Sequence, residues 1–391
     1  MSAPASPLRV SLAPQRARPA SPPALDRDGA RVVLGAQVGD FAQSIAPAAN
    51  TLFGPRGAAV TADGALWICD TGHHRLLGWP ALPQHDAAPA ALLIGQPGFE
   101  CEGRNAHGPA SAHSLNVPTG ICALGEGLAV ADAWNHRVLI WHRAPTRANQ
   151  PADVVLGQPD FAANAINRGR DAPDADSLYW PYGVAFDGTR LWVADTGNRR
   201  VLRWDAIPQR SGQPADGVLG QPDFRHRDEN AGAVGPAGLR WPHAIARWQG
   251  ALALADAGNN RVLLWHATAP SGLQPADAIL GQPDARSIDH NRGEYWPTAG
   301  SLNMPYGIAV QGDRLFVADT ANSRVLRFDA PDHADATALA GQHAFADKGD
   351  NHWHLPARDS LCWPYALATH GDTAIVVDSG NNRVLLWEIA P

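Results

Sequence analysis

The chain has 391 residues, a formal net charge of −7, 45% hydrophobic residues and 18% charged residues. This length exceeds what one ordinary hydrophobic core takes, so it indicates either several domains or a fold that grows by repeating a unit. The acidic balance argues against a protein that binds nucleic acid through a broadly basic surface, and we expect no nucleic-acid partner.

The first segment of the chain, residues 1–30, is rich in Pro, Ala, Ser and Arg and lacks the apolar stretch of a secretory signal. No later segment approaches the run of about 18 apolar residues that a membrane span needs. We therefore expect a disordered tail over 1–30 on a soluble, cytoplasmic protein without a membrane partner. The four cysteines form no CxxC pair and no disulfide framework, so we expect reduced thiols.

From residue 31 onward the sequence repeats one unit. An Asp that ends an apolar run recurs at spacings of 62, 63, 61, 63 and 59 residues, and an Arg always follows it five residues later. An aromatic residue always follows that Arg by four positions. The Asp residues are Asp70, Asp132, Asp195, Asp256, Asp319 and Asp378; the aromatic residues are Trp79, Trp141, Trp204, Trp265, Phe328 and Trp387. Self-similarity at a fixed period is the signature of a propeller or solenoid.

Each unit contains four short apolar runs separated by turn residues. In the third unit they are "YGVAF", "RLWVAD", "RVLRW" and "GVLG". Four strands in each of six units predict an all-β fold, a six-bladed β-propeller of four-stranded antiparallel blades.

The two ends of the chain complement each other. The sixth unit stops after its third run, and the missing run occurs as "RVVLGAQVGDF" at 31–41. We expect 31–41 to complete the last blade and close one domain over 31–391, which removes an exposed sheet edge. On this interpretation deletion of 1–25 is nearly silent, whereas deletion of 1–40 lowers the melting temperature.

The repeated units resemble NHL repeats, and "NHRVLIW" at 135–141 carries much of that pattern. The resemblance covers 31–391 and implies a propeller. It implies no single function, because NHL propellers serve as lyases, sensor domains, RNA readers and protein scaffolds.

Positions where the units agree predict structure, and positions where they differ predict a site. The Asp–Arg turns, the aromatic positions and the repeated "GQP" turns occur in nearly every unit, so we interpret them as structural. One variable residue follows a Pro just before the innermost strand of each unit. These candidates are Arg56, Thr119, Tyr182, His243, Tyr306 and Tyr365, with Trp180, Trp241 and Trp363 before three of the prolines. Polar groups above an apolar wall predict either a ligand pocket on the axis or a plug of the channel.

Three functions remain open from the sequence. We expect a recognition scaffold that binds a protein or a small ligand on this face and in the central funnel. Trp353→Ala or Arg292→Ala in its long loops would then abolish binding. A lyase or hydrolase with an axial site would instead lose turnover on His243→Ala or Arg56→Ala. RNA binding by the loop Arg, His, Trp and Tyr residues is the third reading.

A metal centre is a further prediction. No cofactor is expected, but His73, His136 and His243 could hold a divalent metal from three different blades. The resemblance implies this arrangement, because some NHL lyases hold an axial metal with histidines from several blades. His73 stands where the other units have Asn, which makes it the clearest departure from the repeat.

Overall fold

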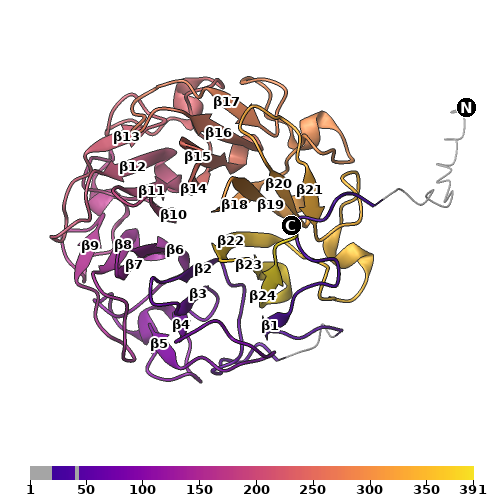
Figure 1. Cartoon of the computed structure of the whole chain (residues 1–391). Coiled ribbons are helices and arrows are strands. Elements are labelled where there is room, and N and C mark those ends of the chain that lie inside the picture. Colours follow the sequence, from indigo (N-terminus) through magenta and orange to yellow (C-terminus); the bar gives the residue numbers. More distant parts are fainter. Residues whose placement is uncertain (1–19, 40–43) are drawn as a thin grey trace, which may run out of the picture.

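The computed structural model describes residues 20–39 and 44–391, which form a ring of six four-stranded antiparallel sheets around a central channel (Figure 1). Blade 1 contains β2 (Gly57–Val60), β3 (Leu66–Asp70), β4 (Arg75–Trp79) and β5 (Leu92–Ile94). Blade 2 contains β6 (Pro118–Leu124), β7 (Gly127–Asp132), β8 (Arg137–Trp141) and β9 (Val154–Leu156). Blade 3 contains β10 (Pro181–Phe186), β11 (Leu191–Asp195), β12 (Arg200–Trp204) and β13 (Gly217–Leu219).

The remaining three blades repeat this order from the axis outward. Blade 4 contains β14 (Pro242–Trp248), β15 (Ala251–Asp256), β16 (Arg261–Trp265) and β17 (Ala278–Leu280). Blade 5 contains β18 (Pro305–Gln311), β19 (Arg314–Asp319), β20 (Arg324–Phe328) and β21 (Ala338–Ala340). Blade 6 contains β22 (Pro364–His370), β23 (Thr373–Asp378), β24 (Arg383–Glu388) and β1 (Val32–Gly35). The predicted six-bladed fold is confirmed.

Short 3-10 helices make the tight turns and lie in the long loops of the described residues. The turns contain η2 (Ala133–Asn135), η4 (Thr196–Asn198), η6 (Ala257–Asn259), η8 (Thr320–Asn322) and η10 (Ser379–Asn381). The loops contain η1 (Arg104–His107), η3 (Ile166–Gly169), η5 (Glu229–Gly232), η7 (His290–Gly293) and η9 (Asp350–Trp353). Within the described ranges no helix has the length and apolar character to cross a membrane.

The hydrophobic core is divided into six clusters, each built from neighbouring blades. In one of them Trp204 of blade 3 packs with Leu191 of its own blade and Leu124 of blade 2. The repeated aromatic residues fall into separate clusters, one in each, so their predicted place in the core between blades is confirmed. Because the middle strands are covered on both faces, their sequences are continuous apolar runs and not alternating ones.

A buried Asp–Arg pair closes the turn between the second and third strands of every blade. In blade 3 the Asp195 Oδ2 accepts a hydrogen bond from Arg200 Nε at 2.8 Å, and Asp195 Oδ1 accepts one from the Tyr179 N–H at 2.7 Å. The six pairs have distances of 2.6–2.8 Å, and both side chains of each are fully buried. The structural interpretation of these turns is confirmed.

The ring is closed by the N-terminal strand. β1 pairs antiparallel with β24, with Val32 opposite Leu386 and Leu34 opposite Val384. Val33 and Leu34 are fully buried, and β1 occupies the outer position that the fourth strand takes in the other blades. The predicted closure is confirmed, although Asp40 and Phe41 of the predicted segment lie outside the described residues.

The boundary of the predicted tail is wrong. Residues 20–30 are ordered: Leu25 forms a bridge with Ile389 and is buried, and the Ala24 N–H donates to the Leu339 carbonyl. The Trp387 indole donates to the Asp26 carbonyl at 2.8 Å, whereas the indole in blades 1–4 donates to a carbonyl nine residues further along. The N-terminal segment therefore replaces the outer loop that blade 6 lacks. Residues 1–19 of the tail lie outside the described residues.

Candidate ligand-binding site

The inner strands begin on one face of the disc, here called the top face, and place an aromatic cluster on the axis. Five of the six inner strands start at Pro, and β2 starts two residues after Pro55. The residue after the Pro lies nearest the axis in five of the six blades. Tyr182 and His243 have ring centroids 5.2 Å apart, His243 stacks on Tyr306 at 4.3 Å, and Tyr306 lies 4.6 Å from Tyr365. The Arg56 guanidinium lies 4.9 Å from the centre of the Tyr365 ring. The structure thus brings five of the six predicted ring residues together.

Thr119 is the sixth predicted ring residue, and it does not reach the axis. Its side chain is fully buried, and its hydroxyl donates to the Pro181 carbonyl at 3.4 Å. A threonine is too short to extend past the inner strands, so its hydroxyl contacts the backbone of the neighbouring blade. Thr119 connects blades 2 and 3 and does not line the funnel.

Glycines let the inner strands come close enough to form a narrow neck. A Cβ atom on Gly183 would lie 1.7 Å from the His243 carbonyl oxygen, and one on Gly57 would lie 2.1 Å from the Thr119 carbonyl oxygen. The neck below the aromatic cluster has a volume of about 80 Å³. From the sequence these residues could either plug the channel or line a pocket. In the structure the aromatic cluster fills the axis and also forms the floor of a wider cavity.

That wider cavity has a volume of about 620 Å³ and opens on the top face between blades 3 and 4. Trp180 of blade 3 and Trp241 of blade 4 lie in its wall, and the two residues are 39% and 42% exposed. Trp363 is 40% exposed but belongs to another seam and is not part of this wall. The complete lining is Tyr179, Trp180, Tyr182, Thr196, Gly197, Arg199, Arg227, Trp241, His243, Tyr306 and Tyr365.

The exposed tryptophans are held in an unusual backbone conformation. Trp180 and Trp241 precede prolines and have φ angles of 48° and 55°, values that bulky residues seldom adopt. In blade 3 the strained residue is fixed by a hydrogen bond from the Trp180 N–H to His136 Nδ1 at 3.2 Å. The backbone of Trp180 is therefore fixed before any ligand arrives, which lowers the entropy cost of binding.

This hydrogen bond recurs at five of the six seams between blades, and we call it the seam hydrogen bond. Its donor is the N–H of the residue before the inner-strand Pro, and its acceptor is a side chain in the turn of the preceding blade. The pairs are Gly54 with Asn382 (2.8 Å), Val117 with His74 (3.0 Å), Trp180 with His136 (3.2 Å), Met304 with Asn260 (2.8 Å) and Trp363 with Ser323 (3.2 Å).

The seam between blades 3 and 4 is the exception. Arg199 occupies the acceptor position, and a guanidinium has only donors. In the described part of the chain the Trp241 N–H has no hydrogen-bond partner. Sequence reasoning missed Arg199 and Arg227, yet a signal was present. The residue four places after the repeated Asp is His, His, Arg, Asn, Ser and Asn in the six units, so Arg199 is the one residue there that cannot accept.

Burial keeps three polar groups of the aromatic cluster, those of His243, Tyr306 and Tyr365, neutral near pH 7. Burial lowers the pKa of His243 to about 4. Burial also raises the pKa of Tyr306 to about 12 and raises that of Tyr365 further. His243 Nδ1 lies 2.8 Å from the Trp241 carbonyl oxygen, which can only accept, so Nδ1 carries the proton and Nε2 is the unprotonated nitrogen.

The stability of the protein should therefore depend on pH through its buried histidines. The pKa values of His74, His136 and His243 are lowered by burial from 6.5 to about 4. Between these values the unfolded state binds more protons than the folded state, so acidification favours unfolding. We expect the melting temperature to fall from pH 6.5 toward pH 4, and to fall less in His243→Gln, whose side chain does not titrate there. Equal pH dependence in both proteins would contradict a buried neutral His243.

The three histidines of the predicted metal centre lie in three separate settings. His73 uses both ring nitrogens, with Nδ1 2.7 Å from Asp70 Oδ2 and Nε2 2.7 Å from the Ile45 carbonyl oxygen. His136 accepts the seam hydrogen bond, and His243 belongs to the aromatic cluster. Among the described residues no group of three or more His, Cys, Asp or Glu side chains could hold a metal ion. As placed, both ring nitrogens of His73 are already engaged by protein groups, and the metal centre stays a prediction.

The departure at His73 has a structural cause. In the other blades the turn Asn pairs with an Asn of the preceding long loop, as Asn198 does with Asn167 at 2.8 Å. Blade 1 is preceded by the chain that follows β1, which offers the Ile45 carbonyl instead. The longer imidazole spans from Asp70 to this carbonyl, so His73 makes the two contacts that the turn Asn makes in the other blades.

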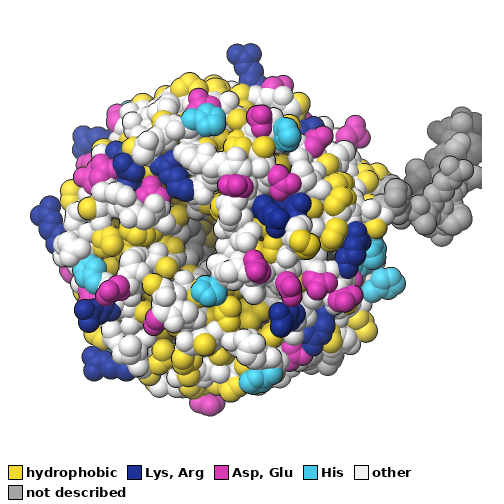
Figure 2. Space-filling model, in the orientation of Figure 1, with side chains coloured by type: hydrophobic (Ala, Val, Ile, Leu, Met, Phe, Trp, Pro, Cys, Tyr) yellow, Lys and Arg dark blue, Asp and Glu magenta, His cyan; other side chains and the backbone are white. Residues whose placement is uncertain are grey.

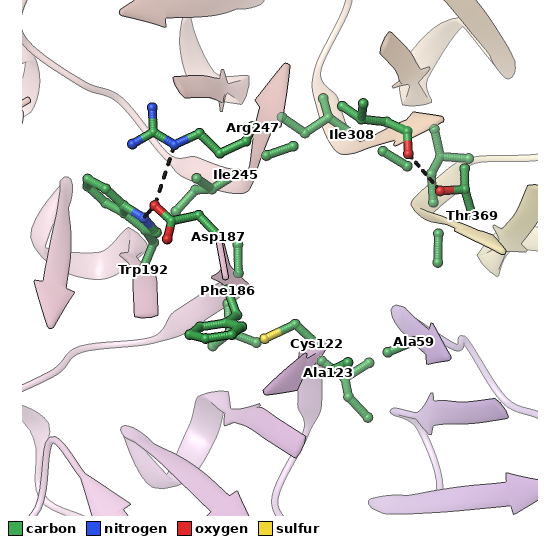
Figure 3. A pocket seen from close by; sticks show the side chains of 18 of the residues that line it. Ala59, Cys122, Ala123, Phe186, Asp187, Trp192, Ile245, Arg247, Ile308 and Thr369 are labelled. Carbon is green, nitrogen blue, oxygen red and sulfur yellow. Dashed lines mark hydrogen bonds and ion pairs between the residues drawn. The ribbon is translucent and has the colours of Figure 1, made fainter. Parts of the chain in front are cut away.

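The channel widens again below the neck, toward the opposite face. This lower part has a volume of about 450 Å³ and is lined mainly by aliphatic side chains of the inner strands. Figure 3 shows its polar corner, where Asp187 accepts hydrogen bonds from Trp192 Nε1 at 3.0 Å and Arg247 Nε at 3.4 Å. The Asp187 carboxylate accepts from both the indole and the guanidinium, so we interpret this corner as structural. The space-filling view is hollowed near its centre, and charged side chains of both signs surround the hollow (Figure 2).

A family model matches two segments of the chain, and several solved structures are similar to it. The NHL repeat family matches residues 54–79 and 302–328, and no curated protein matches the chain. The chain is similar to a streptogramin B lyase structure, with 12% identity, 90% of this chain and 98% of that chain covered, and a TM-score of 0.46. It is also similar to Kuenenia stuttgartiensis hydrazine synthase, with 13% identity, 91% and 99% covered, and a TM-score of 0.48.

A third similar structure is a catalytically inactive variant of virginiamycin B lyase from Staphylococcus aureus with quinupristin. Its identity is 10%, the covered shares are 93% of this chain and 97% of that chain, and the TM-score is 0.45. At such low identity these similarities assign no activity, substrate or partner to this chain.

Proposed function

Because this chain is an NHL-repeat β-propeller, we propose that it is a binding protein whose top-face cavity takes up a small organic molecule with a flat face. The observation that carries the proposal is the cavity between blades 3 and 4, with its volume of about 620 Å³ and seven aromatic rings in its lining, counting the imidazole. Pockets for small molecules commonly have volumes of about 300–1,000 Å³ and combine apolar walls with a few polar groups.

The cavity has the polar groups that would orient such a molecule. The hydroxyl of Tyr306 is neutral near pH 7 and can donate or accept, and His243 Nε2 can accept. Trp180 and Trp241 present aromatic faces on which a flat ring can stack. These features favour a small ligand over a protein surface for the cavity itself.

The proposal is tested by capture of ligands from a metabolite extract of the source cells. The full-length protein is incubated with the extract and washed, and the bound molecules are released by denaturation and weighed by mass spectrometry. We expect enrichment of a small set of molecules, and a reduction of about tenfold with Trp241→Ala, because one stacking wall is lost. Trp353→Ala is the control, since Trp353 is 72% exposed and lies outside the cavity.

Two results would contradict the cavity as the binding site. One is the absence of any enriched molecule with the wild-type protein. The other is full capture by Trp241→Ala together with loss in Trp353→Ala. The second result would move recognition to the loops of blades 5 and 6, where Lys348 Nζ lies 3.6 Å from the centre of the exposed Tyr295 ring. Such an exposed patch suits a protein partner.

A lyase or hydrolase at the axis is the second candidate, and the tautomer of His243 favours it. An unprotonated Nε2 beside the Arg56 charge could act as a general base, with Arg56 stabilising a developing negative charge. The same capture experiment also tests this candidate function, because an enzyme would convert the captured molecule into a product of different mass over time. His243→Gln should then stop the conversion without loss of the folded state.

A further inference from the structure

We propose that the ligand of the top-face cavity carries a negative charge, and that its anionic group binds at the seam between blades 3 and 4. This inference rests on the proposed function and names the chemical class of the ligand. At five seams a side chain of the protein accepts the hydrogen bond of the residue before the inner-strand Pro. At the sixth seam Arg199 stands in place of that side chain, and an oxygen of the ligand acts as the acceptor.

The unpaired donor is the first step of the argument. The Trp241 N–H is equivalent by repeat position to the N–H groups that reach Nδ1, Oδ1 or Oγ at the other seams. It therefore points toward the turn of blade 3, where the Arg199 side chain begins. A carboxylate or phosphate oxygen in that place would accept from the N–H and from the guanidinium together, and such charge-assisted hydrogen bonds are the strong ones.

The charge of the cavity is the second, independent step. Two arginines, Arg199 and Arg227, line the cavity, and its lining contains no Asp or Glu. Arg199 Nη1 donates to the carbonyl oxygens of Arg227 at 3.3 Å and Gly197 at 3.5 Å. The nearest carboxylate to Arg199 is Glu229, at 3.9 Å, and Glu229 also pairs with Arg240 at 3.3 Å. For Arg227 the described residues provide no carboxylate within ion-pair distance. The cavity therefore has an excess of positive charge, since two arginines and no carboxylate line it and burial keeps His243 neutral near pH 7.

The position of this charge also fits the aromatic walls. Arg199 lines the same cavity as Trp180 of blade 3 and Trp241 of blade 4, so a ligand whose anionic group binds Arg199 can place its ring against these aromatic side chains. The class is thus an organic anion with a flat ring. Carboxylates and phosphates share the required chemistry, because both offer oxygens that accept in a forked geometry.

The test uses two fluorescent probes with the same rings. 1-Anilinonaphthalene-8-sulfonate is anionic, and N-phenyl-1-naphthylamine lacks the sulfonate. We expect the full-length protein to bind the sulfonate about tenfold more tightly. Benzoate or phenyl phosphate should displace it, and the one that competes better distinguishes a carboxylate ligand from a phosphate ligand. Neutral benzyl alcohol should not displace it.

The decisive variant is Arg199→Asn, which introduces the acceptor found at Asn260 and Asn382. We expect the variant to remain folded, to lose the preference for the sulfonate and to keep its affinity for the neutral probe. Arg143→Asn is the control, because Arg143 is an exposed arginine outside the cavity, at the end of the blades where the third strands finish. It should behave like the wild type.

The outcomes separate the two proposals. Equal binding of both probes to the wild type, or an unchanged preference in Arg199→Asn, overturns the anion subsite and leaves the cavity as a binding site. Failure of both probes to bind the wild type contradicts the cavity as well. Loss of the preference in Arg143→Asn would show that the sulfonate binds the general surface, which also overturns the inference.

Discussion

Replacement of Arg200 by methionine is expected to destabilise the protein by about 3–5 kcal/mol, because it leaves a buried carboxylate without its partner. Arg200 and Asp195 are both fully buried and 2.8 Å apart. The guanidinium also donates to the carbonyl oxygens of Phe224, Asp174 and Ser177, so one side chain connects two long loops to the blade. Chemical denaturation of the wild type and the variant measures the loss.

A surface pair provides the control for this prediction. Arg143 lies 3.7 Å from Glu126, and both side chains are at least 80% exposed. Arg143→Met should cost no more than about 1 kcal/mol, because water screens the pair. Adding Asp195→Asn to Arg200→Met should recover part of the loss, since no buried charge then stays unpaired. Equal costs for Arg200→Met and Arg143→Met would contradict the structural role of the buried pair.

The repeated positions explain why the fold could be predicted from the sequence. Each Asp–Arg turn and each core aromatic residue occurs in every unit, so its role could be inferred from its recurrence without knowing its contacts. Ring closure followed from counting strands, because the sixth unit lacked one and 31–41 supplied it. The burial of Leu25 was not predicted, since a Pro- and Ala-rich composition is also typical of disorder.

The site was only partly predictable, because it depends on contacts across seams. The spacing from Pro located Tyr182, His243, Tyr306 and Tyr365 correctly on the axis. It could not show that Thr119 is too short to reach the funnel. Nor did it reveal Arg199, whose importance comes from a hydrogen bond that the other five seams make to a residue about 40 positions or more away.

The regularity of the scaffold gives meaning to its exceptions. His73 and Arg199 both depart from the repeat. His73 still makes two hydrogen bonds like those of the turn Asn in the other blades, one to Asp70 and one to the chain before its blade. Arg199 offers no acceptor to the Trp241 N–H, which has no partner among the described residues and lies beside the cavity. A residue at position 199 with a purely structural role would accept the seam hydrogen bond, as Asn or Ser does in other blades. A residue that cannot accept it leaves the Trp241 N–H available to a ligand. The exception thus indicates function because the other seams define the structural alternative.

Deletion of residues 1–40 is expected to lower the melting temperature by on the order of 10 °C, because it removes β1 and the segment that packs beside it. Val33, Leu34 and Leu25 are buried, and each contributes roughly 1.5–3 kcal/mol. The deletion also exposes the edge of β24, whose four paired positions face β1, and an open edge favours aggregation. Differential scanning calorimetry measures the shift.

Stepwise truncation locates the stabilising residues. Deletion of 1–19 leaves every described contact of 20–39 in place and should not change the melting temperature. Deletion of 1–30 should already lower it, because the contacts of Leu25 and the bond from Trp387 to Asp26 are lost. Addition of a peptide spanning 20–40 should restore much of the stability of the protein that lacks 1–40, and the same peptide with Val33→Asp should not. If all three truncated proteins melt like the full chain, blade 6 does not depend on β1 for its stability.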